Sequence, residues 1–178
     1  QTTYNVGFDS QFLNNKFFLN SEFFYSKRED ILTPRNASVP GFTGLALPDE
    51  NIAEVDNRGF ELEAGYHKEF NRDFRMDVSA NVSYNHNEVV FMDEPERAVP
   101  WQQRTGHPYG ARLLYKAIGI FEDEAQVNSM PSWNGAGPGD VIFEDVSGDG
   151  QINSDDKILL DGADAPEWFY GINFDVRY

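Results

Sequence analysis

A strict alternation of apolar and polar residues between Phe74 and Asn87 constrains the fold more than any other feature. The even-numbered positions are apolar up to Tyr84, whereas the odd-numbered positions are all polar or charged. Successive side chains of a β-strand point to opposite faces, so a strand here has one apolar face and one polar face, whereas a helix would mix the two sets. The pattern predicts a strand longer than the roughly three to ten residues that are typical.

Four further segments show the same period of two. They lie within Thr3–Phe12, Phe17–Tyr25, Phe60–His67 and Trp168–Tyr178. Amphipathic helices are not evident, and Glu122–Ser129 is the one candidate for a short helix. The sequence therefore predicts an all-β chain that contributes about five antiparallel strands.

The connections between these strands alternate in length. Leu13–Lys16 and Phe70–Asp73 are short, and they contain Asn and Asp residues that accept turn conformations. Roughly Arg28–Asn57 and Phe91–Glu167 are long. Short turns on one side and long loops on the other are typical of membrane barrels, although a soluble sandwich also has uneven loops. Periodicity alone does not separate a lipid-facing apolar face from one packed inside a sandwich.

Composition narrows the class of protein. The chain has no cysteine, so it has neither disulfides nor a cysteine-ligated metal, and its net charge of −16 argues against nucleic acid as a partner. No apolar run approaches the ~18 residues of a membrane-spanning helix, but a membrane strand needs only about 9–11. Because the chain starts at Gln1 without a signal segment, we expect a mature or excerpted form.

An acidic loop between Asp145 and Asp156 resembles a calcium-binding loop of twelve residues. Such loops place oxygen ligands at positions 1, 3, 5, 7, 9 and 12, with a glycine at position 6, here Gly150. Two positions depart from the usual pattern, because Ser147 and Asp156 stand where Asp or Asn and Glu are common. The alternative is an acidic turn held by side-chain hydrogen bonds without a metal. The predicted Ca²⁺ ligands are Asp145, Ser147, Asp149, the Gln151 carbonyl, Asn153 and Asp156.

Motifs for catalysis are not found. The sequence has no nucleophile elbow, phosphate-binding loop or dinucleotide fingerprint, and its three histidines are scattered. Glu61 and Glu63 share one face of a predicted strand, as a glycosidase pair would, but the polar face of a strand explains them equally well. We therefore expect no enzyme.

The long segment 91–167 is rich in Gly, Pro and aromatic residues, and unstructured loops of this length are uncommon unless they are functional. We expect it to fold on itself. Its aromatic residues are candidates for ligand or partner contacts, with packing in a small core of the loop as the alternative reading of each. The candidates are Trp101, Tyr109, Tyr115 and Trp133.

Several of these segments together resemble the SusC/RagA family of TonB-linked, that is TonB-dependent, outer-membrane proteins. The most specific is Pro138–Gly150, which is similar to the family's P-G-D-I-K-Y-x-D-x-N-G-D-G. Asn57–Leu62 is similar to its N-K-G-x-E-L strand opening, and Pro166–Gly171 to its P-x-x-x-Y-G motif. These landmarks stand in the family's order, whereas Ala111–Ala117 departs from its usual glycine-containing aromatic stretch.

The resemblance implies a transmembrane barrel of roughly 22 strands with an internal plug, energised by TonB. Residues 1–178 would be a partial barrel domain from the C-terminal half, in contact with outer-membrane lipid, and residues 91–167 an extracellular loop that carries the calcium-like motif. The family also implies a SusD-like surface lipoprotein as partner, import of oligosaccharides or peptides, and the outer membrane of a Bacteroidota-like Gram-negative cell. TonB would contact parts of the parent protein other than these strands.

A second hypothesis belongs to another class. The chain is then a soluble, calcium-stabilised β-domain that binds glycans, with Trp101 and Trp133 as stacking residues. Strand length favours the transporter, because Phe74–Val89 exceeds typical sandwich strands.

Overall fold

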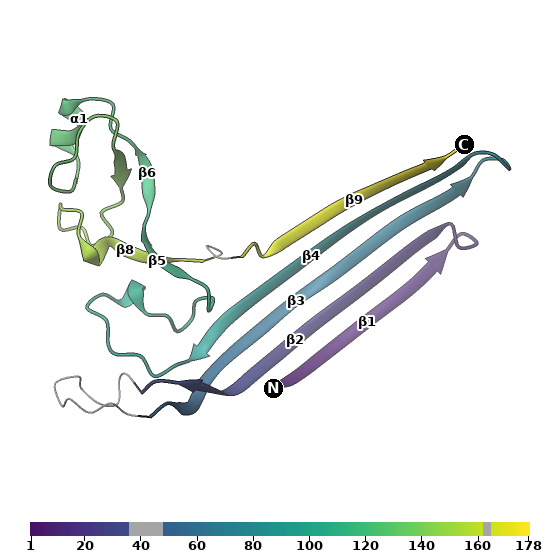
Figure 1. Ribbon diagram of the computed structural model, residues 1–178, viewed down its shortest axis with the longest axis horizontal. Coiled ribbons are helices and arrows are strands. Elements are labelled where there is room, and N and C mark those ends of the chain that lie inside the picture. The colour runs from purple at the N-terminus through teal and green to yellow at the C-terminus, as the bar shows by residue number, and fades with distance from the viewer. Residues whose placement is uncertain (36–47, 162–164) are drawn as a thin grey trace.

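The computed structural model describes residues 1–35, 48–161 and 165–178. A five-stranded antiparallel sheet in the order β1-β2-β3-β4-β9 dominates it (Figure 1). The predicted all-β chain with about five antiparallel strands is confirmed. Among the described residues, no helix is long and apolar enough to cross a membrane. The strands of the large sheet are β1 (Thr2–Phe12), β2 (Phe17–Thr33), β3 (Glu50–Glu69), β4 (Arg75–Phe91) and β9 (Trp168–Arg177).

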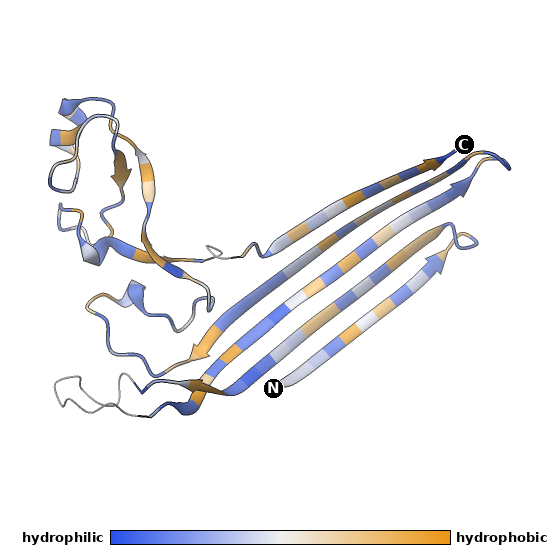
Figure 2. Cartoon of the chain, viewed as in Figure 1, coloured by the Kyte–Doolittle hydropathy of each residue, from blue (hydrophilic) through white to orange (hydrophobic). Residues whose placement is uncertain are grey.

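The strand register sorts the side chains into rows that cross the whole sheet. One row is wholly apolar, and its members are the cross-strand partners Val6, Phe23, Phe60, Tyr84 and Trp168. The next row on the opposite face begins with Gly7 and continues through Glu22, Glu61 and Ser83. The alternation read from the sequence therefore becomes two faces of one sheet, visible as orange and blue bands along each strand in Figure 2.

The apolar face is exposed. Tyr170 is 84% exposed and Ile172 is 78% exposed, although both lie on the apolar face of β9. A soluble sandwich would bury these side chains against a second sheet, and the described chain has none over this face (Figure 1). The arrangement is that of a membrane-barrel wall, where apolar side chains face lipid and polar ones face the lumen.

The second and third strands are longer than the sequence predicted. β2 continues past Tyr25 to Thr33, and β3 begins at Glu50 rather than near Phe60. The predicted loop Arg28–Asn57 is therefore wrong in extent, and only 34–49 lies between the strands. Hydrogen bonds extend the sheet here although apolar and polar residues no longer alternate, as at the adjacent Ile31 and Leu32, so the pattern that marks a strand is lost.

Both predicted tight turns are confirmed. Leu13, Asn14 and Asn15 have φ values of 54°, 56° and 62°, a left-handed conformation that asparagine accepts more readily than most residues. At the other turn, the Asn71 side-chain oxygen accepts hydrogen bonds from the backbone N–H groups of Asp73 and Phe74 at 3.0 and 2.8 Å. These turns lie at one end of the sheet.

Residues 92–161 fold into a lobe at the other end (Figure 1). Phe121 is 1% exposed, and Ile142 and Leu159 are also buried in the lobe. The short helix expected within Glu122–Ser129 forms from Glu124, capped by Asp123, which accepts from the Gln126 N–H at 2.8 Å. The lobe contains η2 (Pro100–Gln102), β5 (Arg112–Tyr115), β6 (Ala117–Ile120), α1 (Glu124–Ser129), β7 (Val141–Phe143), η3 (Ser154–Asp156) and β8 (Lys157–Leu160), with β5 paired to β8 and β6 to β7.

Candidate functional site

The acidic loop lies between β7 and β8 and brings three carboxylates together. Oxygen atoms of Asp145, Asp149 and Asp156 all lie within 4.8 Å of one another. The chain turns sharply between them, because Gly148 and Gly150 have φ values of 73° and 83°. These angles are unfavourable for residues with a Cβ, so the two glycines shape the loop.

Asp156 is the buried member of this cluster, with 0% exposure. Its Oδ1 accepts from the Ser147 N–H at 3.0 Å, and its Oδ2 accepts from the Asn153 N–H at 2.7 Å. Burial alone raises the pKa of this carboxyl, but the hydrogen bonds from Asn153 and Ser147 outweigh it, and the pKa lies below the ordinary value. The group is therefore an anion at neutral pH.

Hydrogen bonds also fix the other two carboxylates. Asp145 accepts from the backbone N–H groups of Gly148 and Gly150 at 2.7 and 2.9 Å. Asp149 accepts from the Gln151 N–H and from the Asn153 side-chain amide, both at 2.8 Å.

Two further predicted ligands, Ser147 and Asn153, lie beside the same cluster. Ser147 Oγ donates to Asp145 at 3.3 Å, and Asn153 Oδ1 accepts from the Asp155 N–H at 2.8 Å. A set made only of oxygen donors suits a hard cation such as Ca²⁺, whose charge would offset the repulsion among three close carboxylates. The residues present therefore fit that ion.

Two side chains from a distant part of the lobe, Trp101 and Gln102, bind the C-terminal end of the acidic loop, and we call this pair the brace. Trp101 donates from Nε1 to the Asp155 carbonyl at 2.8 Å. Gln102 donates from Nε2 to the carbonyls of Ser154 and Lys157 at 2.8 and 3.0 Å. Gln102 carries no signal in the sequence that singles it out, because its partners are more than 50 residues away.

The other three candidate aromatic residues have different environments. Tyr115 packs against Phe143 with ring centroids 5.2 Å apart, and Trp133 packs against the same Phe143 at 5.4 Å. These two rings belong to the small core of the lobe. Tyr109 is 67% exposed, and its backbone N–H donates to Asn87 Oδ1 of β4 at 2.8 Å, which holds it at the end of the sheet.

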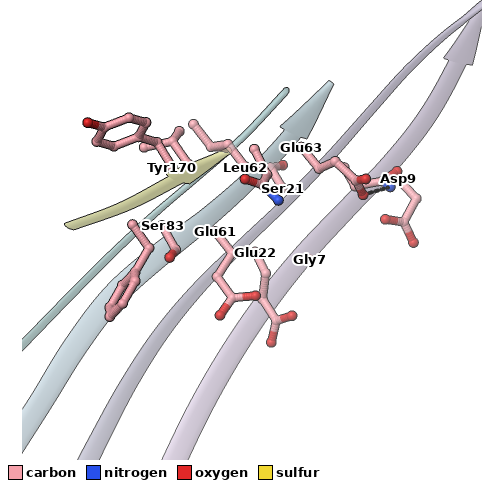
Figure 3. Close-up of a pocket in the computed structure, with 13 residues that line it drawn as sticks. Gly7, Asp9, Ser21, Glu22, Glu61, Leu62, Glu63, Ser83 and Tyr170 are labelled. Carbon is pink, nitrogen blue, oxygen red and sulfur yellow. Dashed lines mark hydrogen bonds between the residues drawn. The ribbon is translucent and has the colours of Figure 1, made fainter. Parts of the chain in front are cut away.

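The polar face of the sheet carries a row of carboxylates. Glu22 of β2 lies directly opposite Glu61 of β3, and both project to the same side, whereas Tyr170 projects to the other (Figure 3). Glu22 and Glu61 line an open cavity of about 540 Å³ together with Asp9 and Glu63. Asn5 and Asn20 donate to Glu22 and Glu63 at 3.0 and 3.2 Å. The two glutamates singled out in the sequence are thus part of a broader acidic stretch of the polar face.

The three histidines are scattered in sequence, yet each contacts a carboxylate in the fold. His67 contacts Asp77 between β3 and β4. His86 Nδ1 lies 2.6 Å from Glu167, and His107 Nδ1 lies 2.9 Å from Asp161. The His86 pair joins β4 to the segment that leads into β9, and the His107 pair joins two distant segments of the lobe, roles that the sequence did not reveal.

The chain matches known proteins along almost its whole length. A family model described as "TonB dependent receptor-like, beta-barrel" matches residues 1–172. TonB-dependent receptor P3 of Formosa agariphila is 27% identical over 97% of this chain and 18% of its own length. TonB-dependent receptor SusC of Bacteroides thetaiotaomicron is 25% identical over 89% of this chain and 16% of its own. The chain therefore spans less than a fifth of these relatives.

Solved structures share the fold. The RagAB peptide importer in its "open-open" state matches 99% of this chain and 19% of the solved chain, with a TM-score of 0.69 and 16% identity. The RagAB peptide transporter matches the same shares with a TM-score of 0.66 and 18% identity.

Proposed function

Because the chain belongs to the TonB-dependent receptor-like β-barrel family, we propose that its parent protein imports oligosaccharides or peptides across the outer membrane. The five-stranded sheet is then part of the barrel wall, and the lobe is an extracellular loop. TonB supplies the energy through other parts of the parent protein. The work is gated passage of the cargo, and it needs no bond to be broken.

One observation carries this proposal most directly: the sheet has an apolar face that nothing in the described chain covers. Val82 and Tyr170 are cross-strand partners on this face, while the adjacent Ser83 lies on the opposite face as the cross-strand partner of Glu61. In a membrane barrel, lipid chains cover such an apolar face, and water in the lumen hydrates the polar face. A five-stranded wall segment of this kind is useful only as part of a closed barrel.

We further propose a SusD-like surface lipoprotein as the partner of the lobe. The similarity to SusC and to the RagAB peptide importer supports this partner. The lobe lies at the end of the sheet away from the tight turns (Figure 1), which is the extracellular end of an outer-membrane barrel. The RagAB importer carries peptides, and either peptides or oligosaccharides suit the polar face here.

Calcium in the acidic loop is part of the same proposal. Three carboxylates within 4.8 Å, the twelve-residue spacing and the buried, anionic Asp156 support it. Bound Ca²⁺ supplies positive charge that holds Asp145, Asp149 and Asp156 together. The brace from Trp101 to the Asp155 carbonyl then fixes the loop to the rest of the lobe.

The test is purification of the complete, tagged parent protein from fractionated native membranes, with co-purifying proteins identified by mass spectrometry. We expect it in the outer membrane together with a surface lipoprotein, and we expect cells that lack it to lose uptake of one class of oligosaccharide or peptide. Recovery as a soluble protein without such a partner contradicts the proposal and supports the calcium-stabilised glycan-binding domain.

A further inference from the structure

A second cavity lies at the lobe end of the polar face. Its volume is about 520 Å³, and strands β2, β3 and β4 form its floor while Tyr109 and the following Gly110 enter from the lobe. Ser26, Asn57 and Asn87 are cross-strand partners in the floor. The cavity therefore lies between the barrel wall and the extracellular lobe, where a cargo molecule would first meet the lumen.

The charge of this cavity is opposite to that of the rest of the chain. The sequence has 30 acidic residues against 14 basic ones, yet among the described residues that line the cavity none is acidic and Arg28 alone is charged. In the described chain, the Arg28 guanidinium contacts the Gln1 side-chain oxygen at 3.1 Å and forms no ion pair. The neighbouring Lys27, by contrast, is paired with Glu29 and Glu54 at 2.6 and 3.4 Å.

The cavity floor offers amide groups to a ligand. Asn57 Oδ1 is buried and accepts no hydrogen bond from the described residues. Such an acceptor is costly unless a donor reaches it. Asn87 uses its Oδ1 to accept from the Tyr109 N–H, which leaves its own N–H₂ group for another acceptor. Tyr109 adds an aromatic ring that is 67% exposed.

The acidic row lies further along the same face. Glu22 is six residues from Arg28 on β2, so the two side chains emerge about 20 Å apart along the strand. Glu22 and Glu61 are direct cross-strand partners there. This acidic row repels a ligand that carries many carboxylates. A ligand with one terminal carboxylate can place it at Arg28, and a neutral or cationic remainder is then compatible with Glu22 and Glu61.

We propose that this cavity is a subsite for the C-terminal carboxylate of a peptide, bound by Arg28. Arginine matches the two oxygens of a carboxylate with a planar pair of N–H donors. Asn57 accepts from a peptide N–H, Asn87 donates to a peptide carbonyl, and the Tyr109 ring covers the terminal side chain. The peptide extends toward Glu22 and Glu61, which receive its N-terminal ammonium. This assignment rests on the proposed transport function and gives the cargo a class and a direction.

The test is binding of labelled random hexapeptides to the full-length parent protein in detergent. One pool has free C-terminal carboxylates and the other is amidated at the C-terminus. We expect the wild type to prefer the free-acid pool, and Arg28→Gln to weaken binding of that pool by roughly tenfold, as loss of a charge-assisted bond does. Lys27→Gln is the matched control, because Lys27 is adjacent but on the opposite face of β2.

Arg28→Lys tests the geometry, since a lysine keeps the charge but loses the planar pair of donors; we expect partial recovery of binding. Circular dichroism checks that each variant is folded. Equal binding of both pools by the wild type, or unchanged binding by Arg28→Gln, overturns the proposal. Tighter, Arg28-dependent binding of an oligogalacturonate overturns the peptide assignment. Failure of the transport function is separate, because it is read from membrane fractionation and uptake rather than from this binding difference.

Discussion

The indole Nε1 of Trp101 donates a hydrogen bond of 2.8 Å to the backbone carbonyl of Asp155, 54 residues later in the chain. This contact joins the η2 turn to the end of the acidic loop, immediately before the buried Asp156. The lobe is therefore held by a specific polar contact as well as by its aromatic core. Ordering a loop of this length costs conformational entropy, and contacts of this kind offset that cost.

Trp101→Phe tests the brace. Phenylalanine keeps most of the ring but has no N–H, so the Asp155 carbonyl loses its partner. We expect the lobe to lose about 1 kcal/mol of local stability, seen as several-fold faster cleavage within 92–161 in limited proteolysis. Trp168→Phe, which lies in β9 outside the lobe, serves as the control. Equal cleavage of the two variants would show that the brace does not stabilise the lobe.

The calcium proposal is tested by titration of the purified parent protein with Ca²⁺ in a calorimeter. Asp145→Asn removes one charge from the cluster while keeping an oxygen, and we expect at least roughly tenfold weaker binding, since affinity follows the charge of the ligands. Asp155→Asn changes the neighbouring residue, which is not a predicted ligand, and should leave binding unchanged. Absence of Ca²⁺ binding in the wild type, or equal binding by Asp145→Asn, contradicts the metal site and leaves a turn held by hydrogen bonds.

Glu94 gives the lobe a predictable response to acid. Its carboxylate accepts from the backbone N–H groups of Arg104 and Thr105, both at 2.9 Å, and from the Thr105 hydroxyl at 2.8 Å. Burial raises the pKa of Glu94, but these hydrogen bonds outweigh it and the pKa lies below its ordinary value. The stabilisation is therefore complete above the unfolded pKa, about 4.3, and is lost as pH falls through the lower folded pKa.

Digestion with pepsin between pH 5 and 2 measures this response. We expect cleavage near residues 94–105 to accelerate below about pH 4 in the wild type. In Glu94→Gln the cleavage should be faster at pH 5 and should change less with pH, because glutamine has no carboxylate to protonate. A wild type and a variant with the same pH profile would show that Glu94 does not hold this turn.

The sequence predicted the faces of the sheet well, and the reasons are local. Phe60 and Tyr84 belong to alternating segments, and they are cross-strand partners on one face. The acidic cluster also follows from spacing, since Asp145 and Asp149 lie in one short loop. The extension of β2 beyond Tyr25 was missed, because hydrogen bonds rather than hydrophobic pattern maintain the sheet there.

Contacts between distant segments could not be predicted from the sequence. Gln102 reaches carbonyl groups more than 50 residues away, and nothing in its local sequence indicates a partner. The cavity between Arg28 and Tyr109 also depends on how the lobe returns to the sheet. Backbone carbonyls accept hydrogen bonds from any donor, so such contacts leave no residue-specific signature.

Gly65 of β3 lies beneath the ring of Phe18, its neighbour on β2. A Cβ at this position would lie 2.3 Å from a ring carbon of Phe18, so Gly65→Ala forces the ring to move. We expect a loss of about 1–3 kcal/mol of stability, measured by urea unfolding of the parent protein in detergent. Gly7→Ala is the control, because its Cβ meets only the Ser21 carbonyl at 3.8 Å. Equal midpoints for the two variants would contradict the close packing at Gly65.

Cysteine labelling along β4 tests the two-faced wall most directly, because residues 1–178 contain no cysteine and any cysteine elsewhere in the parent protein is first replaced by serine. Val78→Cys and Val82→Cys lie on the apolar face, while Ser79→Cys and Ser83→Cys lie on the polar face. In the parent protein reconstituted into lipid vesicles, we predict that a lipid-soluble maleimide labels the first pair and a charged, water-soluble maleimide labels the second. Water-soluble labelling of all four positions, or of Val78→Cys and Val82→Cys alone, would contradict a barrel wall with its apolar face in the membrane.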